Sequence, residues 1–174
     1  MGGIDMTQEN KELLLKDLCA RLPYGVVGQC EIDASYDTSF DTIPQTHKFN
    51  AVVYGIKEDL LFVSPMIENQ NELEFANEEI ANGVDILDFK PYLFPLSSMT
   101  EEMIEEFNNL FNGSFQYFNQ GVISASRIWD RNEAVFVGEL ECSKLIDWFN
   151  AHHIDYRGLI EKGLAIDTTG LNIY

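Results

Sequence analysis

The segment FNAVVYGIKEDLLFVS, residues 49–64, decides the fold class of this chain. Its two ends are apolar runs rich in Val, Phe, Leu and Tyr, and the polar triplet of residues 57–59 separates them. β-branched and aromatic residues favour strands, and a short polar turn between two such runs is typical of a β-hairpin. The sequence therefore predicts a pair of antiparallel strands here.

Upstream of this hairpin the sequence predicts a helix, a strand and a loop. Thr7 can cap a helix over residues 8–21, because the leucines that follow recur at the spacings of one buried stripe. From Tyr24 to Asp33 the apolar period changes to two, which indicates a half-buried strand. Residues 35–48 are rich in Ser, Thr and Asp and contain a proline, so we expect a loop there.

Downstream of the hairpin the regular patterns weaken. Residues 66–83 are acidic and have loosely spaced apolar residues, which predicts no more than a short helical turn near residues 72–81. The sequence VDILDF at 84–89 returns to strand character. Pro91 and Pro95 then favour an extended crossing, because proline restricts both itself and the residue before it.

A central acidic helix is predicted from about Thr100 to Phe111, with apolar side chains on one face. Its cap is either Thr100 itself or Ser98, which forms a capping box with Glu101. We interpret its glutamates as solvated, and the first pair also complements the positive helix N-terminus. They are Glu101, Glu102, Glu105 and Glu106.

The last third of the chain predicts a second hairpin and further helices. The runs 121–129 and 133–141 have strand composition and surround a turn at residues 130–132. The other predicted elements are an edge strand at 113–118, a helix from about Ser143 to His153, and a shorter helix over 157–162 that ends at Gly163.

This order of elements predicts the α+β class. The sheet is expected to be twisted and mostly antiparallel, with about five to seven strands, an N-terminal helix, a central acidic helix and C-terminal helices. Internal repeats are absent from the sequence. We expect one globular domain over 1–174, with a sheet-containing body at 7–141 and a helical segment at 143–174 packed on it.

The composition is that of an ordinary globular domain, with 45% hydrophobic residues in 174. The cysteines Cys19, Cys30 and Cys142 form no close pair, which favours a reducing compartment, and we expect each to be a small buried hydrophobe. The N-terminus lacks a basic region before an apolar core, and no apolar run reaches 18 residues. A cytoplasmic protein without membrane contact is expected.

The strongest compositional signal is the formal net charge of −18, from 29 acidic residues against 11 Lys and Arg. Two thirds of this charge lies between Glu58 and Glu106, where thirteen acidic residues accompany the single base Lys90. Phosphate backbones and anionic membranes are bound through Lys and Arg. Direct nucleic-acid binding is therefore disfavoured, and a protein partner of basic or mixed charge is expected.

Three segments carry a resemblance to a known family. LLKDLCARLPYG at 14–25, FKPYLFPLSSMTEE at 89–102 and LIDWFNAHHIDYRGLIEKGLAIDTTGLNIY at 145–174 are similar to an uncharacterised family of small proteins from gut anaerobic bacteria and their phage-like or mobile elements. No activity follows from this resemblance. It implies a bacterial cytoplasm and an accessory role in a phage or mobile element.

The C-terminal segment contains the candidate interaction residues His152, His153, Asp155 and Arg157. Two imidazoles and a carboxylate are zinc ligand types, but adjacent helical residues point about 100° apart. We therefore predict no metal site and expect His152 to be a hydrogen-bonded, partly buried side chain. Arg157 is expected to pair with a carboxylate or to cap helix carbonyls, and the alternative is that it anchors an anionic partner.

A catalytic site is not indicated. Cys142 or Cys30 with a C-terminal histidine would form a nucleophilic pair, but many carboxylates disfavour a thiolate. The glycines form no phosphate-binding loop or dinucleotide fingerprint. We assign no catalytic, cofactor-binding or metal-binding residue.

Three functional hypotheses remain. The leading one is a non-enzymatic interaction or regulatory accessory protein. The second is an acidic nucleic-acid mimic that occupies a DNA-binding protein, which requires an extended exposed row of carboxylates. The third is a small hydrolase-like enzyme that uses a C-terminal histidine and a carboxylate in one cleft.

Overall fold

The computed structural model describes the backbone of residues 7–38, 41–111, 128–130, 133–135 and 139–174. Side chains are described for residues 7–32, 46–107, 109–110 and 143–174. The chain forms two compact units. The first comprises Met1–Tyr92, Gly163–Ile166 and Ile173–Tyr174, and the second comprises Leu93–Lys162 and Asp167–Asn172. The sequence-based expectation of one domain, with a body at 7–141 and a helical segment at 143–174, stays a prediction.

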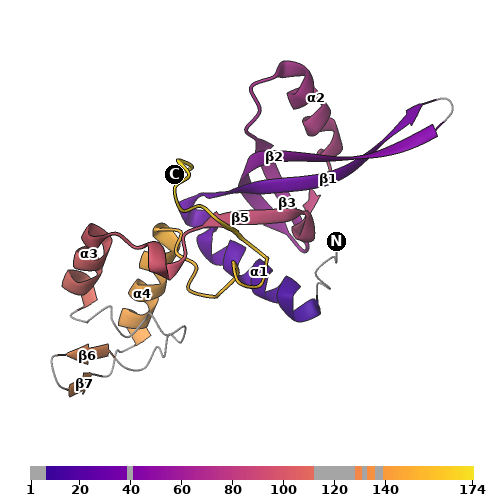
Figure 1. The fold of residues 1–174 in the computed structure, drawn as a ribbon. Helices are drawn as coiled ribbons and strands as arrows, with labels where there is room; N and C mark the ends of the chain where they lie inside the picture. The colour runs from indigo at the N-terminus through magenta and orange to yellow at the C-terminus, as the bar shows by residue number, and fades with distance from the viewer. Residues whose placement is uncertain (1–6, 39–40, 112–127, 131–132, 136–138) are drawn as a thin grey trace. The chain divides into compact units, whose positions relative to one another are not determined.

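The main sheet has six strands in the order β4-β3-β2-β1-β5-β8 (Figure 1), and all of its residues except Leu93 and Asp167 belong to the first unit. The pairings from β4 through β5 are antiparallel, which confirms the predicted α+β class. The strands are β1 (Val26–Thr38), β2 (Asp41–Lys57), β3 (Leu60–Pro65), β4 (Val84–Asp85), β5 (Phe89–Leu93) and β8 (Ile166–Asp167). The 3-10 helix η2 (Ile86–Asp88) interrupts the strand predicted over residues 84–89.

The predicted hairpin at 49–64 is confirmed. Lys57 at the end of β2 lies opposite Leu60 at the start of β3, so Glu58 and Asp59 form a two-residue turn. Glu58 has a φ of 56°. Two-residue hairpin loops require positive φ, because only that backbone twist matches the twist of the flanking strands.

The loop predicted at residues 35–48 is wrong, because these residues continue β1 and β2. The register runs without interruption from Val26 opposite Val53 to Thr38 opposite Asp41. Figure 1 shows the two strands projecting together beyond the rest of the sheet. Once the apolar residues have fixed the register, each further pair adds ladder hydrogen bonds, and these replace the local bonds that Ser, Thr and Asp offer.

The core of the first unit lies on one face of the sheet. Buried residues alternate along β1 at Val26, Gly28 and Cys30, as the predicted period of two requires. At Gly28 a Cβ atom would overlap the Phe89 ring and lie 2.5 Å from the Lys90 carbonyl oxygen. Glycine is thus required where β5 pairs with β1, at Gly28 opposite Pro91.

Helix α1 (Gln8–Arg21) has the predicted bounds, and the Thr7 hydroxyl accepts a hydrogen bond of 3.2 Å from the Asn10 amide. Leu14 and Leu18 are fully buried, as expected. The expectation that Cys19 is buried is wrong, because Cys19 is exposed. The buried face instead includes Asp17 and Arg21, whose side chains are 0% exposed. Their spacing of four residues lets each charge neutralise the other inside the core.

Helix α2 (Gln70–Glu79) has ten residues and begins two residues before the helical turn predicted near 72–81. The Asn69 side chain accepts hydrogen bonds from the Asn71 and Glu72 amides at 3.0 and 3.3 Å, so this residue caps the helix. Ala76 is the buried residue of this helix. Capping, more than an apolar stripe, explains why this acidic segment is helical.

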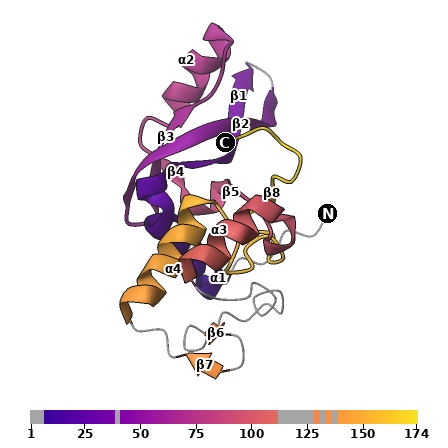
Figure 2. The ribbon, with the colours of Figure 1, turned by 90° about the vertical axis from the view of Figure 1, so that its left-hand side faces the viewer.

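The second unit contains helices α3 (Glu101–Phe111) and α4 (Glu139–Ala151), which lie side by side (Figure 2). Aromatic side chains join them: the ring centroids of Phe107 and Trp148 are 5.3 Å apart. The Thr100 hydroxyl accepts a hydrogen bond of 3.3 Å from the Met103 amide, so Thr100 is the cap of α3. The other buried members of this cluster are Met99, Leu145, Phe149 and Ile154.

Other predictions in the second unit have mixed outcomes. A second hairpin is confirmed where β6 (Ile128–Asp130) pairs with β7 (Glu133–Val135). Helix α4 begins at Glu139, so the strand predicted to residue 141 ends too late. The helix predicted over 157–162 is wrong, because turns occupy this segment. The edge strand at 113–118 lies outside the described residues. Among the described helices, none is long and apolar enough to cross a membrane.

The buried ion pair gives a first prediction. Arg21 Nε lies 2.7 Å from Asp17 Oδ2, and Nη2 lies 3.2 Å from Oδ1. Arg21→Ala leaves a buried carboxylate without this partner and should lower the free energy of unfolding by about 3–5 kcal/mol in urea denaturation. The control Glu31→Gln breaks the exposed Glu31–Lys48 pair, at 2.8 Å, and should cost less than about 1 kcal/mol. Equal losses would contradict a core role for the pair.

The cysteines give a second prediction. Burial, and next the charge of Asp88, raise the pKa of the Cys30 thiol to about 12. Iodoacetamide at pH 8 should therefore modify Cys19 in the native protein and reach Cys30 only in urea, as peptide mapping measures. Because an unfolded thiol ionises near pH 8.5, the contribution of Cys30 to stability should decline as pH rises from about 8.5 to 12. Equal native labelling of both residues would show that the β1 core opens readily.

Candidate functional site

His152 follows the last residue of α4 and is a structural side chain. Its ring stacks on the Trp148 indole, with centroids 4.0 Å apart, and its Nδ1 lies 2.9 Å from the Trp148 carbonyl oxygen. The Glu106 carboxylate accepts a hydrogen bond of 2.8 Å from Trp148 Nε1, and its other oxygen lies 3.7 Å from His152 Nε2. The expectation of a hydrogen-bonded, partly buried His152 is thus met. Glu106 joins α3 to α4, a role beyond the predicted solvation.

His153 and Asp155 shape the chain after α4. His153 is buried with a φ of 53°, and its carbonyl accepts a hydrogen bond of 2.9 Å from the Phe94 amide. The buried Asp155 carboxylate accepts hydrogen bonds from the Leu159 and Ile160 amides at 2.9 and 2.8 Å. These bonds hold the turn after α4, His153 through its backbone carbonyl and Asp155 through its side-chain carboxylate.

Arg157 lies beside a cavity of about 570 Å³ in the second unit. Its guanidinium carbon is 4.7 Å from the centroid of the Tyr156 ring, a cation–π contact. Asp155 and Lys162 also line this cavity, whereas His152 and His153 do not. The hydrolase-like hypothesis required a histidine and a carboxylate in one cleft, and the structure does not bring them together there.

Nucleophilic and metal chemistry have little support among the described residues. Burial raises the pKa of the Cys30 thiol to about 12, which is opposite to the depressed pKa that a thiolate nucleophile requires. The side chain of Cys142 lies outside the described residues. No group of three or more His, Cys, Asp or Glu in the described part of the chain is arranged to hold a metal ion.

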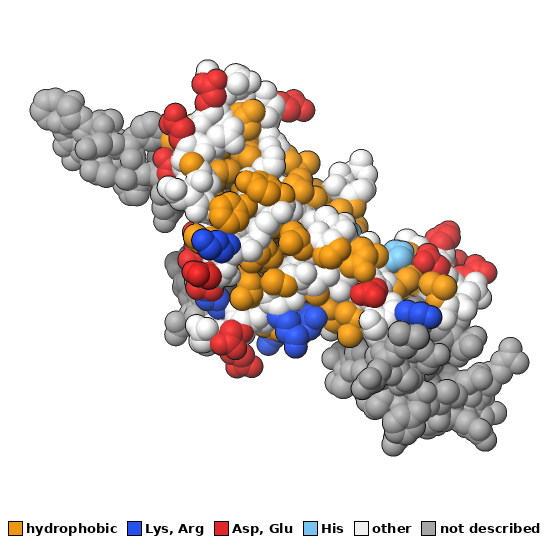
Figure 3. All heavy atoms as spheres, turned by 180° about the vertical axis from the view of Figure 1, so that it is seen from behind, with side chains coloured by type: hydrophobic (Ala, Val, Ile, Leu, Met, Phe, Trp, Pro, Cys, Tyr) orange, Lys and Arg blue, Asp and Glu red, His pale blue; other side chains and the backbone are white. Residues whose placement is uncertain are grey.

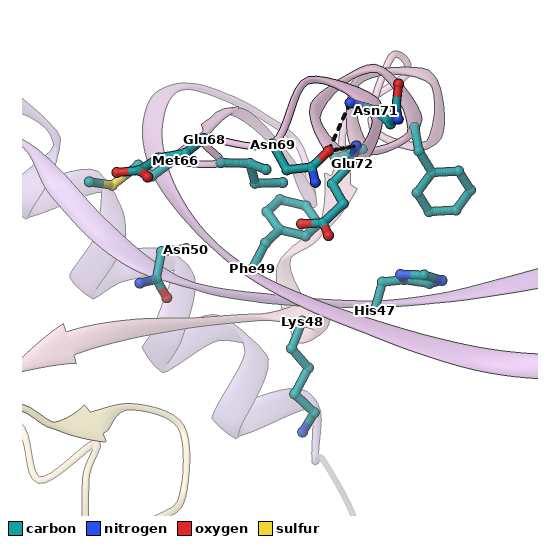
Figure 4. Close-up of a pocket in the computed structure, with 12 residues that line it drawn as sticks. His47, Lys48, Phe49, Asn50, Met66, Glu68, Asn69, Asn71 and Glu72 are labelled. Carbon is teal, nitrogen blue, oxygen red and sulfur yellow. Dashed lines mark hydrogen bonds between the residues drawn. The ribbon is translucent and has the colours of Figure 1, made fainter.

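A larger cavity, of about 640 Å³, lies in the first unit, and we name it the β2–α2 groove. Ligand-binding cavities commonly have volumes of about 300–1,000 Å³, so this groove is large enough to accept side chains of a partner. It is lined by residues 47–50 of β2, by residues 66–69 after β3, and by Asn71, Glu72, Phe75 and Ala76 of α2 (Figure 4).

The groove forms where β3 turns away from β2. β3 ends at Pro65 opposite Ala51, and the Met66 amide donates a hydrogen bond of 2.7 Å to the Asn50 carbonyl. The chain then leaves the sheet and reaches Asn69, which caps α2. The space beside the earlier part of β2 is therefore closed by a loop and a helix instead of a strand.

The apolar wall of the groove comes from alternate residues of β2 and from α2. His47 and Phe49 project from one side of β2, and Lys48 projects from the other (Figure 4). The His47 ring lies 4.7 Å from the Phe75 ring of α2, centroid to centroid. Met66 is 54% exposed at the edge of the groove. His47 Nε2 is buried and has no hydrogen-bond partner among the described residues.

The polar margin of the groove is acidic. Glu68 and Glu72 line it and are exposed, and Figure 4 shows the Glu72 side chain directed toward Phe49. The nearby cation Lys48 already pairs with Glu31 at 2.8 Å. Asn50 accepts a hydrogen bond of 2.7 Å from the Tyr92 hydroxyl, which fixes its amide. The margin therefore favours a cationic group of a ligand.

The sequence patterns do not predict the β2–α2 groove. Its β2 wall crosses from the segment predicted as a loop, which ends at Lys48, into the predicted hairpin strand, and its α2 wall lies in the segment with loosely spaced apolar residues. A usable signal was the alternation of His47 and Phe49 with Lys48, which continues the period of two of the adjoining strand.

The acidic stretch of residues 58–106 does not belong to one unit. Nine of its thirteen acidic residues lie before Leu93 in the first unit, and the four glutamates of α3 lie in the second. On the face shown in Figure 3, described acidic side chains occur in separate groups with apolar side chains between them. This face lacks, among its described residues, the extended row that nucleic-acid mimicry requires.

Comparisons with known proteins return no relative. No family model matches the sequence, and no curated protein or solved structure is detectably similar to it. The resemblance to an uncharacterised family of gut bacteria therefore stays a prediction.

The structural role of Asp155 gives a third prediction. Asp155→Ala removes the acceptor of two backbone amides, one of them buried, and should lower the free energy of unfolding by about 2–3 kcal/mol. The control Asp167→Ala removes the acceptor of one exposed amide, that of Thr169, and should cost about 0.5–1 kcal/mol. Urea denaturation followed by circular dichroism measures both. An unchanged stability of Asp155→Ala would return Asp155 to the functional candidates.

Proposed function

We propose that the protein is a non-enzymatic interaction module whose β2–α2 groove binds a segment of a protein partner. The observation that carries this proposal is an apolar and aromatic wall beside an acidic margin in one cavity. Such a site fits an apolar side chain that lies next to a lysine or arginine. This partner chemistry agrees with the basic or mixed-charge partner expected from the sequence.

Energetics support a binding role that is selective and weak. Burial of an apolar side chain against Phe49, Phe75 and Met66 supplies most of the affinity, at about 25 cal/mol per Å². The exposed glutamates contribute less free energy, because water and salt screen them, but they exclude acidic segments and accelerate the encounter.

The accessory role in a bacterial phage or mobile element rests on the sequence resemblance alone. Nucleic-acid mimicry has less support than partner binding in the groove. The acidic residues belong to two units, and on the face in Figure 3 their side chains form separate groups. The hydrolase-like function has less support as well, since the C-terminal histidines and carboxylate hold the backbone and the aromatic cluster.

The fourth prediction tests the groove with the peptide acetyl-Lys-Val-Phe-Val-Lys-amide. At low salt it should bind and change the amide NMR shifts of residues 47–50 and 66–76, whereas the peptide with Glu in place of both Lys should bind at least about tenfold more weakly. Met66→Ser should weaken binding about fivefold through lost apolar contact. Glu72→Gln should weaken it about twofold to fivefold at low salt and less at high salt.

Matched variants outside the groove serve as controls. Tyr54 is an aromatic residue, 68% exposed, that does not line the groove, and Glu78 is an exposed glutamate of α2 that does not line it. Tyr54→Ser and Glu78→Gln should leave the dissociation constant within about twofold. Equal binding of the Lys and Glu peptides, or shift changes centred on Tyr54, would overturn the proposal.

A further inference from the structure

We propose that the groove binds its partner as an added β-strand, which pairs with the open edge of β2 at Lys48. This inference rests on the proposed function and specifies the conformation of the bound segment. The occupant is an extended segment of a basic protein partner, with an apolar side chain between two lysines or arginines at alternate positions.

The open edge is a consequence of unequal strand lengths. β2 pairs with β1 from Asp41 to Val53, but its pairing with β3 begins only at Ala51. The Asn50 carbonyl accepts a hydrogen bond of 2.7 Å from the Met66 amide, where the chain leaves β3. In the described part of the chain, no strand pairs with β2 on that side before Asn50.

The direction of the backbone N–H and C=O groups along β2 shows which residues face the edge next to β3. The N–H and C=O groups of alternate strand residues point to the same edge. Because the Asn50 carbonyl points toward β3, the backbone groups of Lys48, Thr46 and Pro44 point to the same edge. Pro44 has no N–H, and proline at an edge limits pairing with other chains. Pro44 limits the edge on one side and the Met66 bond to Asn50 limits it on the other, so the edge is short, and Lys48 is the position next to β3.

The groove lies beside this edge on the side of Phe49 and His47. A strand residue directly opposite Lys48 would point to the Lys48 side of the sheet, away from the groove. Its two neighbours would point toward Phe49, Phe75 and the glutamates Glu68 and Glu72. Alternate residues of the partner thus supply the groove contacts, and the residue between them supplies the backbone bonds, as in recognition by strand addition.

Charge distinguishes the partner from a second copy of this chain. Two molecules with a net charge of −18 each repel one another, and the margin of the groove is itself acidic. A basic segment gains from the same field. Self-pairing through β2 is therefore an outcome that would contradict the proposal.

The fifth prediction uses N-methylated forms of the same peptide. When phenylalanine and the lysines face the groove, the valine amides face β2 and the phenylalanine amide faces away. Methylation of both valine amides should weaken binding about tenfold or more, because whichever valine lies opposite Lys48 loses the N–H that donates to the Lys48 carbonyl, and the methyl group blocks close approach of the strands. Methylation of the phenylalanine amide is the matched control and should leave the dissociation constant within about twofold. The unmethylated peptide should also slow hydrogen exchange of the Lys48 amide.

The outcomes separate the two proposals. Binding in the groove that responds equally to both methylation patterns, with unchanged exchange at Lys48, would overturn strand addition and leave the proposed function intact. Absence of binding by the unmethylated peptide would overturn the proposed function itself. Concentration-dependent dimerisation without peptide, with Lys48 protected in the dimer, would show that a second copy occupies the edge and would also overturn strand addition.

Discussion

The antiparallel pairing of β1 with β2 is the constraint on which the first unit depends. Its register joins thirteen residue pairs and aligns the buried positions of both strands on one face, so that Cys30 lies opposite Phe49 and Val26 opposite Val53. A slip by one residue would exchange the two faces of β2. Lys48 would then enter the groove wall, and His47 and Phe49 would leave it. The groove is therefore a property of register as much as of composition.

A structural element can be predicted from the sequence when the interactions that form it are local. The α1 helix was predictable to its ends, because Thr7 and the leucine spacing act within a few residues. The β2–β3 turn was predictable for the same reason. The outer part of β1 and β2 was not, since a segment rich in Ser, Thr and Asp becomes a strand only when a partner with a fixed register lies beside it.

The same argument explains the errors at individual residues. Cys19 was expected in the buried stripe, but the helix instead buries Asp17 and Arg21, and local periodicity does not show that two charges will neutralise each other. Glu106 was interpreted as solvated, although it accepts a hydrogen bond from Trp148, 42 residues away in sequence. The groove likewise requires α2 to lie beside β2, a long-range contact that no local pattern encodes.

The candidate residues predicted from the sequence lie in the second unit, whereas the β2–α2 groove lies in the first. The C-terminal segment, in which the candidate site residues were expected, contains groups whose hydrogen bonds hold backbone turns and an aromatic cluster. A group that already accepts two backbone amides, as Asp155 does, is poorly suited to binding a ligand, because the ligand would have to replace bonds that maintain the fold. In the β2–α2 groove, by contrast, Met66 and Glu72 are exposed, and the Lys48 backbone borders an edge that β3 leaves open. Binding there adds contacts and breaks none of the hydrogen bonds that support the sheet, which is why the first unit is the better location for an interaction site.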